Sequence, residues 1–349
     1  MPTLLLIQWV LLFEVLLIVG MAVFTVLSFQ RRRSHDHFLS NERANLKAAL
    51  QKILAEARPF VTTELPPRHL EINILIPVLE ELDRTETSAA WRSMKAVAYH
   101  SVFGNWARTQ SASRRASKRN WAARCFSLYA EIADEIHILK LIKDDIPLVR
   151  LKGVYCALKL ETAAAIYSVI ERVSAESRLA RTLYLDGLMS HPVAVKPLIV
   201  PLLNSSQNPG VRQVCYELMS RLEIPVQLSV IVSDLKSDDL ELRLAATRAL
   251  STLPDEGCES MLAAMLKDTE WEVRAIAARS LGYRRGTGQI PQLSAGLSDR
   301  QWWVRINSAL ALARLGATGQ AELHRHLKNE DKFARDAAVY ALNIPHETA

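Results

Sequence analysis

Two seven-residue segments, DTEWEVR at residues 268–274 and DRQWWVR at residues 299–305, decide the fold of this chain. Each ends in a Val-Arg pair, and the arginines are Arg274 and Arg305. An arginine recurs at this same spacing along most of the sequence, at Arg119, Arg150, Arg181, Arg212, Arg243, Arg274 and Arg305, and once more at Arg335, one position earlier than the spacing requires. An unbroken period of this length is typical of a stacked-repeat architecture.

The residues around each arginine predict an amphipathic helix. The position before the arginine is apolar in seven of the eight units, and the third position after it is small in seven. Together with the seventh position after it, these residues lie along one stripe of an α-helix. A shorter helix is expected before each of them, as at 258–266 and 289–297. Asp268 and Asp299 are predicted to cap the longer helices.

This Asp-x(4)-Val-Arg pattern ahead of an Ala/Leu-rich helix resembles the HEAT repeat, especially the short HEAT-like form of bacterial scaffold proteins and phycobilin lyases. The resemblance covers roughly residues 88–342. It implies an all-α, right-handed α-solenoid of about eight helix pairs. Each arginine lies at the edge of the buried stripe, where it can reach an acidic group or a loop carbonyl of the next unit. We therefore expect a structural ladder of Arg150, Arg181, Arg212, Arg243, Arg274 and Arg305.

Composition agrees with a helical protein, because the 349 residues include only 12 Gly and 14 Pro and contain no useful run of alternating strand pattern. The four cysteines, Cys125, Cys156, Cys215 and Cys258, form no C-x-x-C motif. Three of them fall at small or inward positions of the repeat. Buried free thiols are therefore expected, which suits a reducing compartment.

The N-terminus predicts a membrane anchor. Residues 4–29 carry Glu14 as their only charge, and crossing a bilayer takes about 20 apolar residues. No basic residue precedes the run and no small-x-small cleavage site follows it, so a cleaved signal peptide fits poorly. Arg31, Arg32 and Arg33 come next, and the positive-inside rule then places the C-terminal domain in the cytoplasm. We expect a single-pass protein of the inner (cytoplasmic) membrane.

Three segments follow from these patterns. Residues 1–30 are the transmembrane anchor, residues 31–87 a basic juxtamembrane segment with a helical N-terminal cap, and residues 88–349 the repeat solenoid. Glu14 lies near mid-membrane, where a charge is costly. Two interpretations stay open for it: an intramembrane contact with another membrane protein, or a protonated glutamate that the bilayer tolerates.

A basic stretch opens the first repeat. Residues 101–130 contain six basic residues and no acidic one, and their charge equals the +6 of the whole chain. We expect a long exposed loop here. Contact with anionic lipid head groups is predicted for Arg108, Arg114, Arg115 and Lys118. Nucleic acid is a second, less favoured ligand of the loop at 108–124, and a merely solvated loop is the third interpretation.

Helical geometry also predicts a partner surface. Positions −3, +1, +5 and +8 relative to each arginine point away from the buried stripe, yet several of them are large and apolar. An apolar inner surface of a solenoid is typical of a protein-binding site. The residues assigned to it are Leu151, Tyr155, Leu158, Leu244, Trp271, Trp302, Trp303, Ile306 and Leu310. The alternative is burial by neighbouring repeats.

No catalytic motif was found: there is no G-x-S-x-G, H-E-x-x-H, P-loop or dinucleotide fingerprint. The pairs His35/His37 and His324/His326 are weak metal signals. We therefore expect a non-enzymatic scaffold without cofactor or metal, which holds or regulates a membrane-associated protein partner while residues 4–29 contact the lipid bilayer. The alternatives are a lyase-type or enzyme-accessory HEAT protein, by analogy alone, or a nucleic-acid-binding one.

Overall fold

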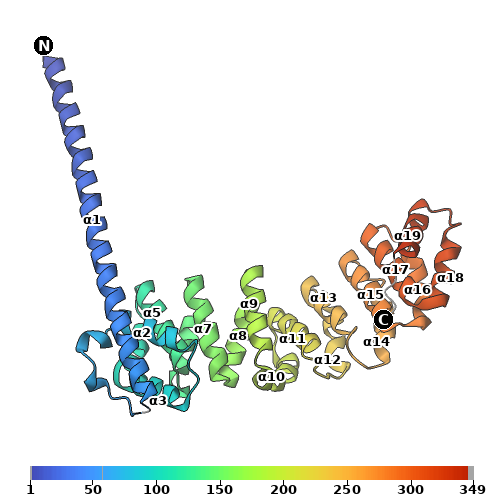
Figure 1. The fold of residues 1–349 in the computed structure, drawn as a ribbon. Helices are drawn as coiled ribbons and strands as arrows, with labels where there is room; N and C mark the ends of the chain where they lie inside the picture. Colours follow the sequence, from blue (N-terminus) through green and yellow to red (C-terminus); the bar gives the residue numbers. More distant parts are fainter. Residues whose placement is uncertain (1, 57, 345–349) are drawn as a thin grey trace. The chain divides into compact units, whose positions relative to one another are not determined.

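A computed structural model describes residues 2–56 and 58–344 of the chain, with the backbone alone for residues 2–16 and 178. Throughout this part of the chain the regular structure is helical (Figure 1). The described residues form two compact units, one of residues up to 141 together with 145–152, the other of residues 142–144 and those from 153 on. The all-α prediction is confirmed.

The α-helices are α1 (Pro2–Ala55), α2 (Ile72–Leu82), α3 (Ala89–Ala98), α4 (Gly104–Gln110), α5 (Ala116–Leu128), α6 (Glu135–Ile142), α7 (Pro147–Leu160), α8 (Ala163–Ser174), α9 (Arg178–Met189), α10 (Pro192–Ser205), α11 (Pro209–Arg221), α12 (Ser229–Val232), α13 (Leu240–Ala249), α14 (Gly257–Met265), α15 (Trp271–Arg284), α16 (Ile290–Gly296), α17 (Trp302–Arg314), α18 (Gly316–His326) and α19 (Lys332–Asn343). The short helices are η1 (Thr62–Glu64), η2 (Pro67–Leu70), η3 (Tyr99–Phe103), η4 (Ile132–Asp134), η5 (Asp234–Lys236) and η6 (Thr287–Gln289).

In the first unit, α1 runs without a break from the apolar N-terminal run into the predicted cap (Figure 1). Its C-terminal part packs on α2 through the buried side chains of Leu46, Leu50 and Ile53. Arg43 fixes the pair, because its Nε and Nη2 donate to the carbonyl oxygen of Asn73 at 3.2 and 2.7 Å. The predicted cap, residues 31–87, therefore contains the C-terminal part of α1 together with η1, η2 and α2.

The predicted anchor coincides with the N-terminal part of α1. Among the residues that the structure describes, no helix combines the length and the apolar character that a membrane crossing requires. The side chains of residues 2–16, Glu14 included, lie outside the described part of the chain.

The expectation of a long exposed loop at residues 101–130 is wrong. A π-helical turn at Tyr99–Phe103 leads directly into α4, and α5 follows after a short turn and packs on α4. The charge is balanced from outside the stretch, since Arg108 pairs with Asp134 and Arg124 with Glu80. A search for acidic residues within the stretch could not detect these partners.

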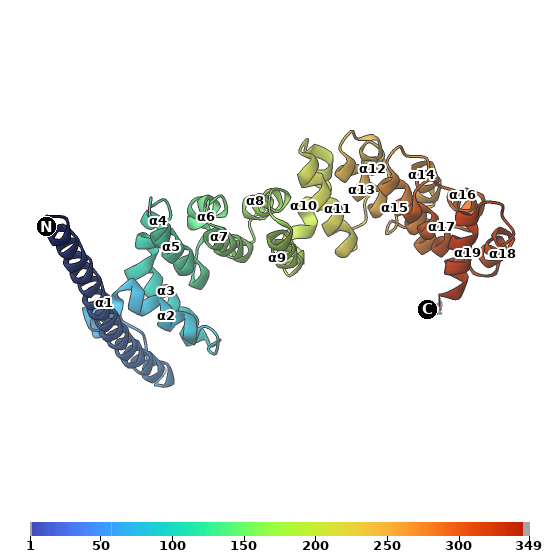
Figure 2. The ribbon, with the colours of Figure 1, turned by 90° about the horizontal axis from the view of Figure 1, so that it is seen from above.

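Each periodic arginine is the fourth residue of its helix, in α5, α7, α9, α11, α13, α15, α17 and α19. In the second unit, another helical element precedes each of these helices; α14 and α16 are shorter than α15 and α17, whereas α8 and α10 are not shorter than α9 and α11. Figures 1 and 2 show α13, α15, α17 and α19 side by side in this order, as a repeat stack requires. The predicted helix pairs are thus confirmed.

Small residues let the long helices approach closely. Ala246, Ala277 and Ser308 occupy the same position of three successive repeats, and all three are fully buried. At Gly282 the backbones approach closely, because a Cβ atom there would lie 2.7 Å from the Cα of Ala311 on α17. All four cysteines are buried free thiols, as expected.

Candidate binding groove

Arg274 shows what the periodic arginine does. Its Nη1 donates to the carbonyl oxygens of Asp268 and Thr269, at 2.8 and 3.0 Å, in the turn before its own helix. Its Nε and Nη2 donate to the two carboxylate oxygens of Asp299 in the next repeat, at 2.8 and 3.0 Å. One guanidinium thus joins two repeats, and only 6% of the residue is exposed.

The other ladder residues vary this pattern. Arg243 bonds the carbonyl oxygen of Ser237 at 2.6 Å and pairs with Asp268 of the next repeat at 3.4 Å. Arg212 donates to Asp234 from Nε at 2.8 Å, and Arg181 pairs with Glu217 on α11 at 3.2 Å. Further bonds to turn carbonyls are made by Arg119 to Ser113, Arg150 to Asp145, Arg305 to Asp299 and Arg335 to Asn329. These arginines therefore form their hydrogen bonds and ion pairs with groups of the same chain.

Asp268 and Asp299 are not helix caps, which corrects the sequence prediction. The cap positions of α15 and α17 are Glu270 and Gln301. The aspartates lie two residues earlier and accept the backbone N–H of these cap residues at 2.9 and 2.8 Å. Burial raises the pKa of Asp299, but the hydrogen bonds from Arg274 and the Gln301 N–H outweigh it and lower the pKa below its ordinary value. The aspartate therefore serves the ladder as an ionised acceptor.

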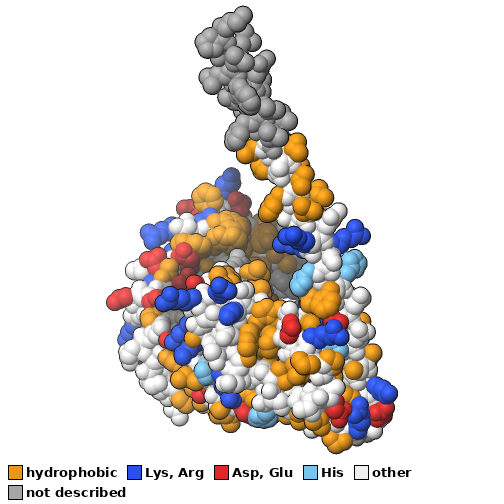
Figure 3. Space-filling view, turned by 90° about the vertical axis from the view of Figure 1, so that its left-hand side faces the viewer, with side chains coloured by type: hydrophobic (Ala, Val, Ile, Leu, Met, Phe, Trp, Pro, Cys, Tyr) orange, Lys and Arg blue, Asp and Glu red, His pale blue; other side chains and the backbone are white. Residues whose placement is uncertain are grey.

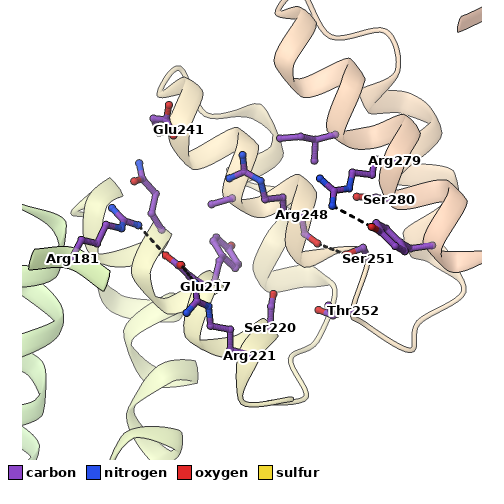
Figure 4. Close-up of a pocket in the computed structure, with 15 residues that line it drawn as sticks. Arg181, Glu217, Ser220, Arg221, Glu241, Arg248, Ser251, Thr252, Arg279 and Ser280 are labelled. Carbon is purple, nitrogen blue, oxygen red and sulfur yellow. Dashed lines mark hydrogen bonds and ion pairs between the residues drawn. The ribbon is translucent and has the colours of Figure 1, made fainter. Parts of the chain in front are cut away.

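A groove of about 490 Å³ opens across α9, α11, α13 and α15 (Figure 4). It lies in the second unit. Every element that lines it is one of the arginine-bearing helices or the turn that follows α13. Most of the side chains that line it are polar, and Ile276, Tyr216 and Tyr283 add apolar and aromatic surface.

The charge of the groove is positive, since four arginines and two glutamates line it. Glu217 is held between Arg181, at 3.2 Å, and Arg221, at 2.7 Å. Arg248 and Arg279 are exposed and lie on neighbouring helices (Figure 4). Among the described residues, neither has a carboxylate partner.

The pKa of Tyr283 is lowered by the positive potential at one end of the groove. Arg279 donates a hydrogen bond to its hydroxyl at 3.1 Å, and the guanidinium of Arg314 lies 4.6 Å from the ring centroid. The hydrogen bond from Arg279 lowers the pKa of Tyr283 below its ordinary value, and the charges of both arginines act in the same direction against burial. An anionic group is therefore stabilised at this place.

Comparison with known protein families matches residues 258–343 to the family described as HEAT repeats. Residues 258–343 are HEAT repeats. This agrees with the helix pairs α14/α15, α16/α17 and α18/α19, which this segment contains. No curated protein matches the chain.

Solved structures of several proteins are similar to this chain. An engineered protein shares 18% identity, with 76% of this chain and 87% of that one covered and a TM-score of 0.38. The Escherichia coli protein YibA shares 16%, with 74% and 99% covered and a TM-score of 0.39. Human deoxyhypusine hydroxylase in complex with glycerol shares 19%, with 68% and 94% covered and a TM-score of 0.30. At these TM-scores, the likenesses say nothing about what this chain binds or catalyses.

The predicted partner-binding residues divide into three groups. Exposed are Tyr155, Trp302 and Trp303; half-buried are Leu151, Trp271 and Leu310; buried are Leu158, Leu244 and Ile306. For the last three the prediction is wrong. A helix inside a stack of helix pairs has neighbours on both flanks, so its buried arc is wider than the single stripe assumed from the sequence. Leu158, for example, fills the space above Gly187 on α9.

Trp302 and Trp303 form an exposed aromatic pair at the start of α17. About half of each residue is in contact with solvent, at 50% and 52%, and their rings stand nearly perpendicular with centroids 4.5 Å apart. Phe333, the second residue of α19, is 60% exposed and lies under the guanidinium of Arg305. Two successive arginine-bearing helices, α17 and α19, therefore begin with exposed aromatic rings.

Arg108 is not free to bind an anionic surface, which corrects another prediction. Its Nε donates to the buried Asp134 at 2.7 Å and its Nη2 to the hydroxyl of Tyr99 at 2.6 Å. Arg114, Arg115 and Lys118 are exposed around the start of α5. The described residues contain no group of three His, Cys, Asp or Glu side chains that could hold a metal ion.

The cationic groove itself was missed. The sequence did carry a signal, because Arg248 and Arg279 are separated by one full repeat and share position +5 of their units. Tyr155 and Leu310 at the same position of other repeats led to the expectation of an apolar inner surface. When the residues at one position are considered over all repeats together, a charge that only two neighbouring repeats carry at that position is overlooked.

The ladder makes stability depend on pH through Asp299. Because its pKa is lowered in the folded state, its contribution is present above the unfolded pKa, about 3.9, and is lost as pH falls through the folded value. We expect Asp299→Asn to lower the free energy of unfolding by about 1–3 kcal/mol at pH 7. In denaturant melts, the gap between wild type and variant should shrink below about pH 4.

The matched control is Asp238→Asn, which removes the same charge from an exposed residue. Its effect should stay within about 0.5 kcal/mol. Equal losses in both variants, or a gap that does not change with pH, would show that Asp299 has no special role.

Proposed function

We propose that this protein is a non-enzymatic scaffold that docks a protein partner on its HEAT repeats and is held at the inner membrane by its N-terminus. The observation that carries the docking part is the exposed aromatic group on α17 and α19: Trp302, Trp303 and Phe333. Large exposed rings on rigid helices are enriched at binding hot spots, where truncation of one side chain can cost about 2 kcal/mol or more.

The polar residues of the groove support binding rather than turnover. Glu217 is neutralised by two arginines, and Ser251 donates its hydroxyl proton to the carbonyl oxygen of Arg248. Within the described groove, no nucleophile is hydrogen-bonded to a general base, which covalent catalysis requires. The side chains of the groove are arranged to present their charges to a bound partner.

The membrane part of the proposal rests on residues 4–29. In the described portion of this run, nine large apolar side chains between Leu17 and Phe29 are exposed. Figure 3 shows apolar side chains along this part of α1, followed by basic ones. Arg31, Arg32 and Arg33 supply the positive charge that favours a cytoplasmic location of the following domain. We propose that the bilayer covers the apolar segment, that Glu14 lies within it, and that the HEAT repeats are cytoplasmic.

Docking can be tested with Trp302→Ala combined with Trp303→Ala. Since both rings are half exposed, the melting temperature should fall by no more than about 4 °C, whereas crosslinking of the partner in membranes should be lost. The control variant, Tyr167→Ala with Val193→Ala, truncates exposed side chains on α8 and α10 and should retain the crosslink. A large drop in melting temperature, with the crosslink retained by the folded fraction, would instead make the tryptophans structural.

Topology is tested independently. A reporter that is active only in the cytoplasm, fused after Ala349, should give signal, and one that is active only in the periplasm should give none. Replacement of Arg31, Arg32 and Arg33 by glutamine should weaken this orientation. The reverse pattern of reporter activity would remove the proposed compartment, and a protein found in the soluble fraction would remove the anchor.

A further inference from the structure

Two arginines of the groove are placed to bind an anion together. Arg248 on α13 and Arg279 on α15 occupy the same position of consecutive repeats, and both are exposed. Figure 4 shows them extending into the groove from neighbouring helices. Arg279 uses one Nη2–H for the hydroxyl of Tyr283. Among the described side chains, none accepts a hydrogen bond from the guanidinium of Arg248. Both can therefore donate to a ligand.

The lining of the groove around Arg248 and Arg279 has a positive net charge. The nearest acidic residue on α11, Glu217, is already occupied by Arg181 and Arg221. Beyond Arg279, the ring of Tyr283 lies under the guanidinium of Arg314 as well. Glu241 is the other acidic residue of the lining, which with four arginines and two glutamates keeps a net positive charge.

The spacing of the helices determines which spacing of negative charges fits the two arginines. Packed helices lie about 8–10 Å apart, so equivalent side chains of consecutive repeats recur at that distance. A polyproline II chain has three residues per turn and rises about 3.1 Å per residue, so every third side chain returns to the same face after about 9 Å. An extended peptide with a carboxylate at every third position would thus match one arginine per repeat.

We infer that the groove binds an acidic, extended segment of the protein partner, with Arg248 and Arg279 each holding a carboxylate three residues apart in that segment. Arginine suits this role because its planar fork binds a carboxylate through two parallel hydrogen bonds. The inference rests on the proposed scaffold function and specifies the partner's chemistry.

Two other polyanions fit less well. A strand of duplex nucleic acid places its charges much more closely than one per repeat, at about 3.4 Å of axis per phosphate. A bilayer presents its head groups on a flat surface, which cannot enter a hollow between helices. The spacing of one arginine per repeat therefore favours a peptide.

The test is fluorescence polarisation with the full-length chain in detergent. The probe is a fluorescein-labelled peptide of four Glu-Pro-Pro repeats; its permuted control has the same composition but four consecutive glutamates. We expect the repeat peptide to bind roughly tenfold tighter than the permuted one, a factor of ten being about 1.4 kcal/mol. Binding should weaken as salt rises.

The decisive variant is Arg248→Gln with Arg279→Gln, which should lower the affinity at least roughly tenfold. Arg84→Gln with Arg92→Gln is the matched control, because it removes the same charge from exposed residues in the other unit, and its affinity should be unchanged. Thermal melts of both variants should match the wild type, which shows that the groove variant is folded.

Three results would overturn the inference: equal affinity for the permuted peptide, unchanged affinity in the groove variant, or tighter binding of an oligo-dT probe at the same salt concentration. Partner crosslinking in membranes separates this failure from that of the scaffold. If the tryptophan variant loses the crosslink while the groove variant keeps it, only the acidic-segment inference falls. If both variants keep the crosslink, the proposal that the partner docks on Trp302 and Trp303 falls as well.

Discussion

The guanidinium that joins neighbouring repeats, as in Arg243 and Arg274, is the interaction on which the rest of the structure depends. Arginine suits this position because it has five N–H donors in a fixed planar arrangement. In Arg274, one side of that plane serves the turn of its own repeat and the other serves Asp299 of the following repeat. The contact therefore sets both the start of the helix and its distance from the next helix.

The groove inherits its geometry from this link. Arg248 and Arg279 come five residues after ladder arginines, Arg243 and Arg274. Five residues are little more than one helical turn, so the two kinds of arginine keep a constant relation from repeat to repeat. One kind is buried and bonded to the protein, whereas the other is exposed. The stack thereby places these two exposed arginines on neighbouring helices, at a spacing of about one helix.

How much the sequence predicts depends on whether a feature repeats. The regular spacing of the arginines was sufficient to place the helices that bear them, the small residues at their crossings and the linking role expected of Arg274. Leu158, Leu244 and Ile306 were misassigned because the second flank of each helix is covered by residues far away in the sequence. Arg108 was misassigned because its partner, Asp134, lies beyond the basic stretch in a different helical element. Such pairings depend on tertiary contacts, which no local pattern records.

Amide hydrogen exchange of Arg274→Lys tests most directly whether the arginine link holds the stack together. A lysine ammonium is a single point of charge and cannot serve two turn carbonyls and a carboxylate at once. We expect faster exchange in both α15 and α17, the two helices that Arg274 connects, and unchanged exchange in α8. Faster exchange confined to the turn before α15, with α17 as protected as in the wild type, would show that the repeats are held together by apolar packing alone.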